Sequence, residues 1–182
     1  MVIGLTGANA SGKGEAADYI RSKGFILYSL SDILRDECKK KGLKESRENL
    51  ILLGNELRTK NGPSILAERI IKNIKEGKDY IIDSIRNPFE IESLRRLDDF
   101  ILIGIDAPIE LRFERLAKRN RPGDPETLED LVEKEQKENI DNSCNQQLDK
   151  CLELADIVLI NDSTIEVFHR KIDEAISEDK KT

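Results

Sequence analysis

Short apolar runs and longer amphipathic stretches alternate along this chain. After each apolar run, hydrophobic residues recur every three or four positions, which predicts a helix. Strands that alternate with helices favour a parallel sheet, so the pattern predicts an α/β fold. The runs that have the length of buried strands are Val2–Thr6, Phe25–Tyr28, Tyr80–Ile82, Phe100–Asp106 and Ala155–Ile160.

A glycine-containing loop follows the first of these strands. Its sequence is Gly7-Ala8-Asn9-Ala10-Ser11-Gly12-Lys13-Gly14, and it leads into a helix that we expect from about residue 11 to residue 23. Glycines let the backbone curl, so that successive N–H groups surround a phosphate at a helix N-terminus. Lys13 is spaced to reach the outer phosphates of a nucleoside triphosphate. A turn that binds nothing is the alternative, and a lysine in register between a strand and a helix argues against it.

The loop matches the Walker A pattern except at its last position. There Gly14 stands where a Ser or Thr hydroxyl should bind Mg²⁺. We therefore expect Mg²⁺ to be held largely through water, with Glu15 and Asp83 as the candidate acids. The loop residues expected to contact ATP are Gly7, Asn9, Ala10, Ser11, Gly12, Lys13, Gly14 and Glu15.

Residues near the C-terminus offer weaker signals. Asn161 follows the last strand, where a mononucleotide-binding sheet commonly borders the adenine, although capping the next helix is the alternative. Gln146 and Gln147 could touch a nucleotide, but we expect them on the surface. His169 lies within the C-terminal helix, and we expect it to be structural.

Polar residues that suit an acceptor site follow the second strand. Ser31 and Asp32 open an amphipathic helix at the carboxyl end of this strand, where ligands collect in an open α/β sheet. Either residue could instead only cap the helix. Arg35, one turn further on, favours a second anion site.

Two consecutive helices, expected over residues 46–60 and 64–75, are more than a simple crossover needs. We expect residues 31–77 to form a helical substrate-binding insertion. Arg58, near the end of the first of these helices, is its candidate substrate ligand, and a solvated helix face is the alternative.

The third strand ends in Asp83-Ser84-Ile85-Arg86-Asn87-Pro88. Asp83 can hold Mg²⁺ through water or hydrogen-bond a substrate, and Arg86 can make a charge-assisted fork to phosphate. Asn87 is expected both to contact the substrate and to cap the helix that Pro88 begins.

An arginine-rich stretch over residues 112–126 follows the longest apolar strand. Its cations either solvate a surface helix or form a mobile lid that neutralises charge in the transition state. The break at Arg121-Pro122-Gly123-Asp124-Pro125 favours a lid. The residues expected to act in catalysis are Lys13, Asp83, Arg86, Arg115, Arg119 and Arg121.

Composition limits the classes of function. A chain of 182 residues is long enough for one domain with a substantial core, so we expect a single domain over residues 1–182. A net charge of −6 argues against a general nucleic-acid coat. Three cysteines without paired spacing indicate neither a disulfide framework nor a zinc site. With no leader or membrane span in the sequence, we expect a cytoplasmic monomer or homodimer whose partner is a small nucleotide.

Taken together, these motifs resemble those of P-loop nucleoside monophosphate kinases of the adenylate kinase type. Within that superfamily the chain is most similar to the kinase-like domain at the N-terminus of some deoxycytidylate deaminase-type proteins. It is also similar to archaeal nucleotide kinase-like and dephospho-coenzyme A kinase-like proteins. The resemblance implies a three-layer P-loop NTPase fold with a five-stranded parallel sheet, ATP and Mg²⁺ at the Gly7 loop, an acceptor phosphate near Arg35, Arg58 and Arg86, and an arginine lid.

Three functions stay open at this stage. The leading hypothesis is phosphoryl transfer from ATP to a nucleoside or deoxynucleoside monophosphate. The second is dephospho-coenzyme A kinase activity, for which Asp32 would have to direct the proton of a ribose hydroxyl. The third is a nucleotide-sensing module without turnover, which the Gly14-Glu15 ending motivates.

Overall fold

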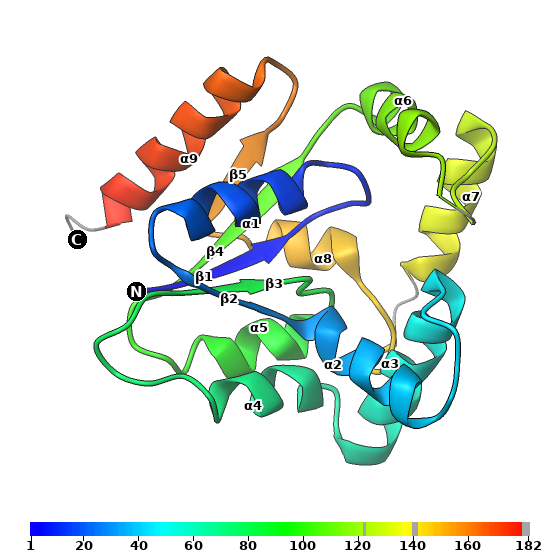
Figure 1. The fold of residues 1–182 in the computed structure, drawn as a ribbon, viewed down its shortest axis with the longest axis horizontal. Helices are drawn as coiled ribbons and strands as arrows, with labels where there is room; N and C mark the ends of the chain where they lie inside the picture. The colour runs from blue at the N-terminus through cyan, green and yellow to red at the C-terminus, as the bar shows by residue number, and fades with distance from the viewer. Residues whose placement is uncertain (122, 140–141, 180–182) are drawn as a thin grey trace.

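The fold is a parallel sheet between two layers of helices (Figure 1). The structure is a computed structural model, and it describes residues 1–121, 123–139 and 142–179. The strand order is β2-β3-β1-β4-β5 and all pairings are parallel, which confirms the α/β, five-stranded expectation. The strands are β1 (Val2–Thr6), β2 (Ile26–Ser29), β3 (Tyr80–Asp83), β4 (Phe100–Asp106) and β5 (Ile157–Ile160).

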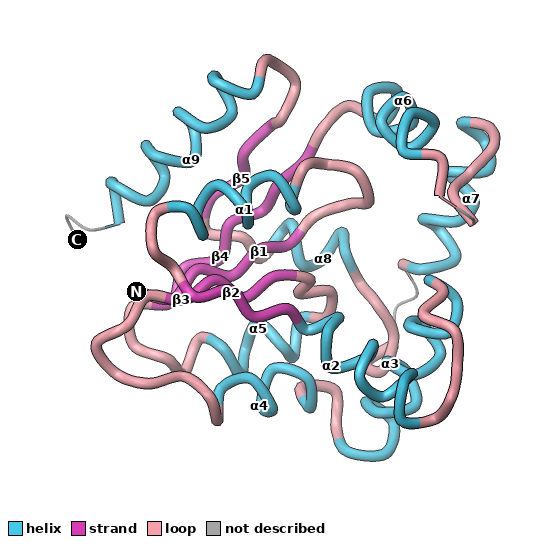
Figure 2. The backbone as a smooth tube through the Cα atoms, viewed as in Figure 1, coloured by secondary structure: helices cyan, strands magenta, loops and turns pink. Residues whose placement is uncertain are grey.

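Helices cover both faces of the sheet, as the backbone trace shows (Figure 2). One face carries α1 (Lys13–Ser22) and α9 (Ile165–Asp179). Two more helices, α6 (Ile109–Arg119) and α7 (Leu128–Glu138), lie beyond the carboxyl end of β4. The opposite face carries α2 (Leu30–Lys40), α3 (Arg47–Asn61), α4 (Ile65–Ile71), α5 (Pro88–Leu94) and α8 (Leu148–Glu153).

Side chains of β1 contribute to the hydrophobic cores on both faces of the sheet. Ile3 and Leu5 are completely buried against the α1 and α9 layer, and Val2 points to the opposite core. Each fully buried aliphatic side chain of this kind stabilises the fold by about 1.5–3 kcal/mol. Because a central parallel strand is covered on both faces, its sequence is an apolar run rather than an alternating one.

The strand order places the glycine-containing loop at the centre of the carboxyl edge. β1 pairs with β3 on one side and with β4 on the other. The loop after β1 therefore lies between the ends of these two strands, at the edge where ligands bind in open α/β sheets.

A cluster of aromatic and charged side chains joins α1 to α9. The ring of Tyr19 stacks on His169 with 3.7 Å between centroids and 8° between planes. The Tyr19 hydroxyl donates to Asp173 at 2.8 Å, and the Lys23 ammonium pairs with the same carboxylate at 2.7 Å. His169 thus serves the packing of the C-terminal helix, in line with the structural role expected for it.

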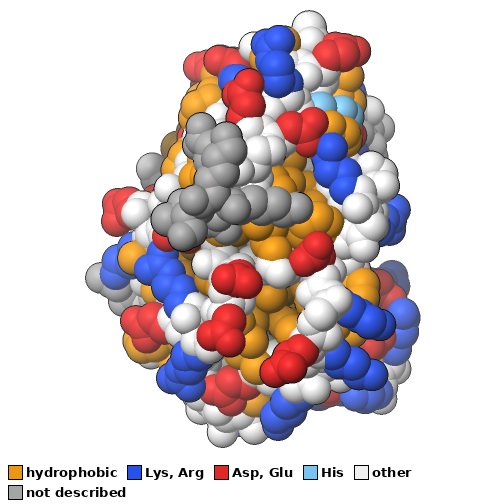
Figure 3. Space-filling model, turned by 90° about the vertical axis from the view of Figure 1, so that its left-hand side faces the viewer, with side chains coloured by type: hydrophobic (Ala, Val, Ile, Leu, Met, Phe, Trp, Pro, Cys, Tyr) orange, Lys and Arg blue, Asp and Glu red, His pale blue; other side chains and the backbone are white. Residues whose placement is uncertain are grey.

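The face turned toward the chain termini is mixed in charge. Figure 3 shows acidic and basic side chains interspersed on it, with hydrophobic side chains between them. Within the part of the chain that the structure describes, no helix is long and apolar enough to cross a membrane.

Candidate functional site

The loop between β1 and α1 adopts a conformation that needs glycine at two positions. Gly7 has φ +140°, and a Cβ there would lie 2.0 Å from the carbonyl oxygen of Ile105. Gly12 has φ +111°, and a Cβ there would lie 2.1 Å from Nδ2 of Asn161. Both values fall in the left-handed region that side chains disfavour. The loop therefore curls tightly against β4 and the end of β5.

Two side chains hold this loop from the outside. The Arg115 guanidinium donates to the carbonyl oxygens of Ala10 at 3.2 Å, Ser11 at 3.3 Å and Asn161 at 3.0 Å. Asn161 Nδ2 donates to the Ser11 carbonyl at 2.8 Å. The sequence had suggested lid closure for Arg115 and adenine contact for Asn161. In the structure both residues fix the shape of the loop.

Lys13 lies folded over the loop that it follows. Its Nζ donates to the carbonyl oxygens of Gly7 at 2.7 Å and Ala8 at 2.6 Å. Burial, followed by the positive charge of Arg86, lowers the pKa of Lys13 to about 7, against an opposing effect of Asp83. An anion bound in the loop would favour the charged ammonium, so this lysine is arranged to accept a phosphate.

Three buried polar atoms around the loop lack a partner within the described structure. They are Asn9 Nδ2, Ser11 Oγ and Asp83 Oδ1. Buried polar groups are almost always hydrogen-bonded, so these atoms indicate a missing polar ligand. A donor amide, a hydroxyl and a carboxylate oxygen fit a triphosphate with hydrated Mg²⁺.

The chain offers few groups that could hold the metal directly. Among the residues described, no group of three or more His, Cys, Asp and Glu side chains is arranged for a metal ion. Glu15 Oε1 is hydrogen-bonded to Nε2 of His169 at 2.7 Å, on the α9 side of α1. Asp83 is thus the better placed of the two expected acids, and Mg²⁺ would depend on phosphate oxygens and water for its other ligands.

A hydroxyl network runs from Asp83 toward α2. Ser84 Oγ donates to Asp83 Oδ2 at 3.1 Å and lies 3.5 Å from Ser31 Oγ, which accepts from Arg35 Nη1 at 2.9 Å. Ser84 has φ +66°, a strained conformation for a non-glycine residue. Asp32 lies on the exposed side of α2 and pairs with Arg35 at 2.5 Å.

A cleft of about 500 Å³ opens from the loop toward α2 and α3. Its walls come from separate segments, and its arginines outnumber its acids, Glu45 and Asp124. Apolar residues of α2, α3 and α4 close one side: Leu30, Leu34, Leu50, Ile51 and Leu66. The polar lining consists of Asn9, Ser31, Arg35, Glu45, Ser46, Arg47, Arg58, Ser84, Arg86, Arg119, Arg121, Asp124 and Gln146.

The sequence analysis did not single out Arg47 as a residue of the cleft, and it treated nucleotide contact by Gln146 only as the alternative to the surface. Arg86 Nη1 donates to Oε1 of Gln146 at 3.2 Å, and among the described residues Arg86 has no carboxylate ion pair. Burial and the charge of Arg47 lower the pKa of Arg86. The expectation that Gln146 and Gln147 lie on the surface was wrong, since each is only 6% exposed. Gln147 is buried because its backbone and side chain bond to the Arg86 and Asn142 carbonyls.

Arg58 and Asn87 are held by structural partners. Arg58 Nη2 donates to Oε1 of Glu90 at 2.7 Å, and the two side chains are 3% and 0% exposed. Asn87 is fully buried and caps α5 through Phe89 N, while its Nδ2 donates to the Ser143 and Asn145 carbonyls. Arg58 still borders the cleft, whereas Asn87 does not.

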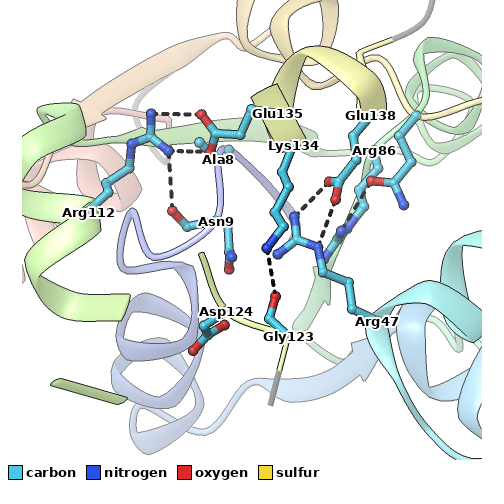
Figure 4. A network of polar contacts seen from close by, with 12 residues as sticks. Ala8, Asn9, Arg47, Arg86, Arg112, Gly123, Asp124, Lys134, Glu135 and Glu138 are labelled. Carbon is cyan, nitrogen blue, oxygen red and sulfur yellow. Dashed lines mark hydrogen bonds and ion pairs between the residues drawn. The ribbon is translucent and has the colours of Figure 1, made fainter. Parts of the chain in front are cut away.

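The arginines of α6 and the loop after it have different partners. Arg112 pairs with Glu135 of α7 and lies 3.5 Å from the Asn9 carbonyl (Figure 4). Arg119 binds Asp124 at 3.1 and 2.5 Å, and both residues border the cleft together with Arg121. Pro122, within the expected lid, lies outside the described residues. The lid over residues 112–126 stays a prediction.

Comparisons with known proteins agree with this geometry. A family profile described as "AAA domain" matches residues 6–132. A UPF0200 protein of Pyrococcus abyssi is 32% identical over 183 residues, covering 97% of this chain and 95% of that protein. A UPF0200/UPF0201 protein of Archaeoglobus fulgidus is 35% identical over 177 residues, covering 94% of this chain, which spans only 53% of that protein.

A solved structure extends the likeness to the whole fold. Shikimate kinase from Aquifex aeolicus superposes with a TM-score of 0.54 at 19% sequence identity, covering 99% of this chain and 98% of that one. At this identity the likeness shows a shared P-loop kinase fold.

Proposed function

We propose that this chain, which belongs to the UPF0200 family and carries an AAA domain with a P-loop kinase fold, transfers a phosphoryl group from ATP to a nucleoside or deoxynucleoside monophosphate. One observation carries the proposal. The phosphate loop opens directly into a cleft lined by arginines, which suits an acceptor that is itself a phosphate. The arginines of this cleft are Arg35, Arg47, Arg58, Arg86, Arg119 and Arg121.

Different residues of the chain bind the donor and the acceptor. The loop amides and the Lys13 ammonium hold the donor phosphates at the N-terminus of α1. Arg86, which has no carboxylate ion pair among the described residues, binds the acceptor phosphate from the other side. Asp83 would help to hold a hydrated Mg²⁺, and the ion would supply positive charge that screens the repulsion between the two anions.

The apolar side of the cleft supports a nucleoside as the rest of the acceptor. Leu34 and Leu50 lie on facing helices, with Leu66 behind them. Such a wall takes the flat surface of a base and keeps water away from the reacting phosphates. Closure of the arginine-bearing segment after α6 would complete the exclusion of water.

A monophosphate acceptor needs no general base, because its phosphate is already a nucleophile. A hydroxyl acceptor, as in dephospho-coenzyme A, needs an acid near the donor to take the proton. Asp32 was the candidate, but it is exposed, pairs with Arg35 and does not border the cleft. This placement favours the monophosphate acceptor over the ribose hydroxyl.

A nucleotide-sensing module without turnover is the second candidate function. Its support is Gly14, which leaves the loop without the hydroxyl that binds Mg²⁺ in the Walker A pattern. A Cβ at Gly14 would meet nothing within 4 Å, so space alone does not explain the glycine.

The test is a coupled assay of ADP formation from ATP and Mg²⁺. The acceptors are a panel of ribo- and deoxynucleoside monophosphates, with dephospho-coenzyme A as the competing substrate class. Lys13→Ala serves as the inactive variant, and Lys78→Ala, an exposed lysine just before β3, serves as the matched control. We expect Lys13-dependent turnover with at least one monophosphate and full activity in Lys78→Ala. Turnover with dephospho-coenzyme A alone, or ATP binding with no product from any acceptor, would contradict the proposal.

A further inference from the structure

A second arginine lies beside Arg86 at the mouth of the cleft. Arg47 is the first residue of α3, and its side chain borders the cleft while remaining 36% exposed. Its Nε donates to Oε1 of Glu138 at 2.8 Å, and its Nη2 donates to Oε2 at 2.7 Å. This two-bond fork fixes the guanidinium in the plane of the Glu138 carboxylate. Among the described residues, Nη1 of Arg47 has no hydrogen-bond acceptor.

Arg47 and Arg86 form a pair of like charges. Figure 4 shows the two guanidinium groups next to each other below α7, with Glu138 on one side. The charge of Arg47 lowers the pKa of Arg86 and also that of Lys13, so its electrostatic influence reaches both the acceptor site and the donor loop. Glu138, Asp83 and Glu90 partly offset the repulsion at Arg86. Among the described residues, however, only Arg47 of the two arginines has an ion pair with a carboxylate.

Two other arginines of the cleft are also paired with an acid. Arg58 is paired with Glu90 in a buried site, and Arg119 is paired with Asp124 through two hydrogen bonds. Arg47 differs from them in its neighbour, because it lies beside Arg86, which bonds only to the neutral Gln146 among the described residues. Two neighbouring guanidinium groups at one cleft are an arrangement that binds a phosphate dianion.

We propose that Arg47 binds the phosphate of the acceptor together with Arg86, and that Glu138 of α7 holds Arg47 at the edge of the cleft for this contact. The inference rests on the proposed function for the identity of the acceptor. The anion site itself requires only that a phosphate enters the cleft. The inference assigns a binding role to Arg47, the first residue of α3.

The test measures phosphate binding directly. The donor loop is first saturated with a non-hydrolysable ATP analogue and Mg²⁺, and inorganic phosphate is then titrated in by calorimetry. The same titration is repeated with each nucleoside monophosphate of the panel. The variants are Arg47→Ala, Arg47→Lys and Glu138→Gln. Arg69→Ala is the matched control, since Arg69 is also 36% exposed and ion-paired across two helices, with Glu37, but does not border the cleft.

A direct contact predicts a particular order of affinities. Phosphate should bind Arg47→Ala at least tenfold more weakly than the wild type, and Arg47→Lys should lie between them because lysine keeps the charge but loses the fork. Glu138→Gln should bind phosphate as well as the wild type or better, because it removes a nearby negative charge and keeps one acceptor for Arg47. In Arg47→Ala the affinity for the ATP analogue should change less than the affinity for phosphate, because only the charge of Arg47 reaches the loop. Arg69→Ala should match the wild type in both.

Three results would overturn the inference. The first is an unchanged phosphate affinity in Arg47→Ala, and the second is no phosphate binding in the wild type. The third is an equal loss of affinity in Arg47→Ala and Glu138→Gln, which would show that the ion pair is purely structural. Failure of the proposed function looks different. In that case inorganic phosphate still binds in an Arg47-dependent manner, but no nucleoside monophosphate binds or reacts.

Discussion

At the scale of single residues, two glycines of the loop after β1 have different surroundings. Gly12 is held at φ +111° with Nδ2 of Asn161 close to it, whereas Gly14, the second residue of α1, has open space where a Cβ would lie. Both are part of the same motif in the sequence. Their surroundings nevertheless predict opposite responses to an added methyl group.

Gly12→Ala should therefore weaken ATP binding, and Gly14→Ala should not. The left-handed conformation alone costs a non-glycine residue about 1–2 kcal/mol, and the clash with Asn161 adds to it, so we expect a loss of about tenfold or more in ATP affinity. Calorimetric titration of ATP into both variants measures the difference. Equal affinities in the two variants would show that the loop rearranges more freely than its packing indicates.

Lys13 offers a second prediction at this scale. Without nucleotide its pKa is lowered to about 7, mainly by burial and then by Arg86. A bound triphosphate favours the charged form and raises the pKa. At pH 8 the free lysine is mostly neutral and the bound one charged, so ATP binding should take up about 0.9 proton, and this uptake should shrink as the pH falls below 7.

Calorimetry of ATP binding in buffers of different ionisation enthalpy measures this proton uptake. Lys13→Arg is the control, because a guanidinium stays charged at every pH used. It should bind ATP without the lysine's proton. The same uptake in Lys13→Arg as in the wild type would mean that another group takes the proton.

At the scale of helices and strands, one buried ion pair connects α3 to α5 and to the loop that follows β3. Glu90 of α5 accepts from Arg58 of α3 through Oε1 and from the backbone N–H groups of Arg86 and Asn87 through Oε2. The carboxylate thereby fixes α3 and the start of α5 relative to each other. The position of Arg86 in the cleft depends on this contact.

Arg58→Ala should destabilise the protein strongly, because it leaves the Glu90 charge buried without its partner. Such changes cost about 3–5 kcal/mol in the free energy of unfolding. The comparison variant is Arg21→Ala, which removes an exposed pair with Asp18 and should cost no more than about 1 kcal/mol. Urea unfolding followed by circular dichroism gives both values. Similar stability in the two variants would contradict the structural role of the pair.

The elements that could be predicted from sequence are those with local signals. β1, β3 and β4 are apolar runs, so the fold could be predicted. The spaced glycines and lysine after β1 likewise predict a candidate donor site, which stays a prediction. Arg47 carries no such signal. It reaches the cleft only because α3 packs across α2 and because α7, far along the chain, supplies Glu138.

Contacts between segments that are distant in sequence also explain why some residues have surroundings other than those we expected. Arg115 belongs to an arginine-rich helix, and its spacing shows the helical face but not the carbonyl oxygens that meet that face. Gln146 reads as a surface residue because its neighbours are polar. It is buried by its contact with Arg86, which comes from a strand end sixty residues away in sequence.

At the scale of the whole molecule, the donor loop and the acceptor cleft share one helix as their outer support. Glu135 of α7 binds Arg112, which reaches the loop at Asn9, and Glu138 binds Arg47 at the cleft (Figure 4). Under the proposed function, ATP at the loop and the acceptor in the cleft would each lie near an arginine that α7 holds. Occupancy of the site should therefore stabilise the entire domain.

ATP with Mg²⁺ should raise the melting temperature in proportion to its binding. At a ligand concentration a hundred times the dissociation constant, the stabilisation is about 2.7 kcal/mol. For a domain of this size that corresponds to a shift of about 5–10 °C. Differential scanning calorimetry measures it, with Lys13→Ala expected to show a much smaller shift. A full shift in that variant would place the stabilising ATP elsewhere.

The stacked rings of Tyr19 and His169 make the protein its own optical reporter. The chain has no tryptophan and three tyrosines, so tyrosine dominates its near-ultraviolet absorption and emission. Tyr28 and Tyr80 stack on each other in one core, whereas Tyr19 lies alone against an imidazole between α1 and α9. A change in the emission of Tyr19 would therefore report on the junction of α1 and α9 without any attached dye.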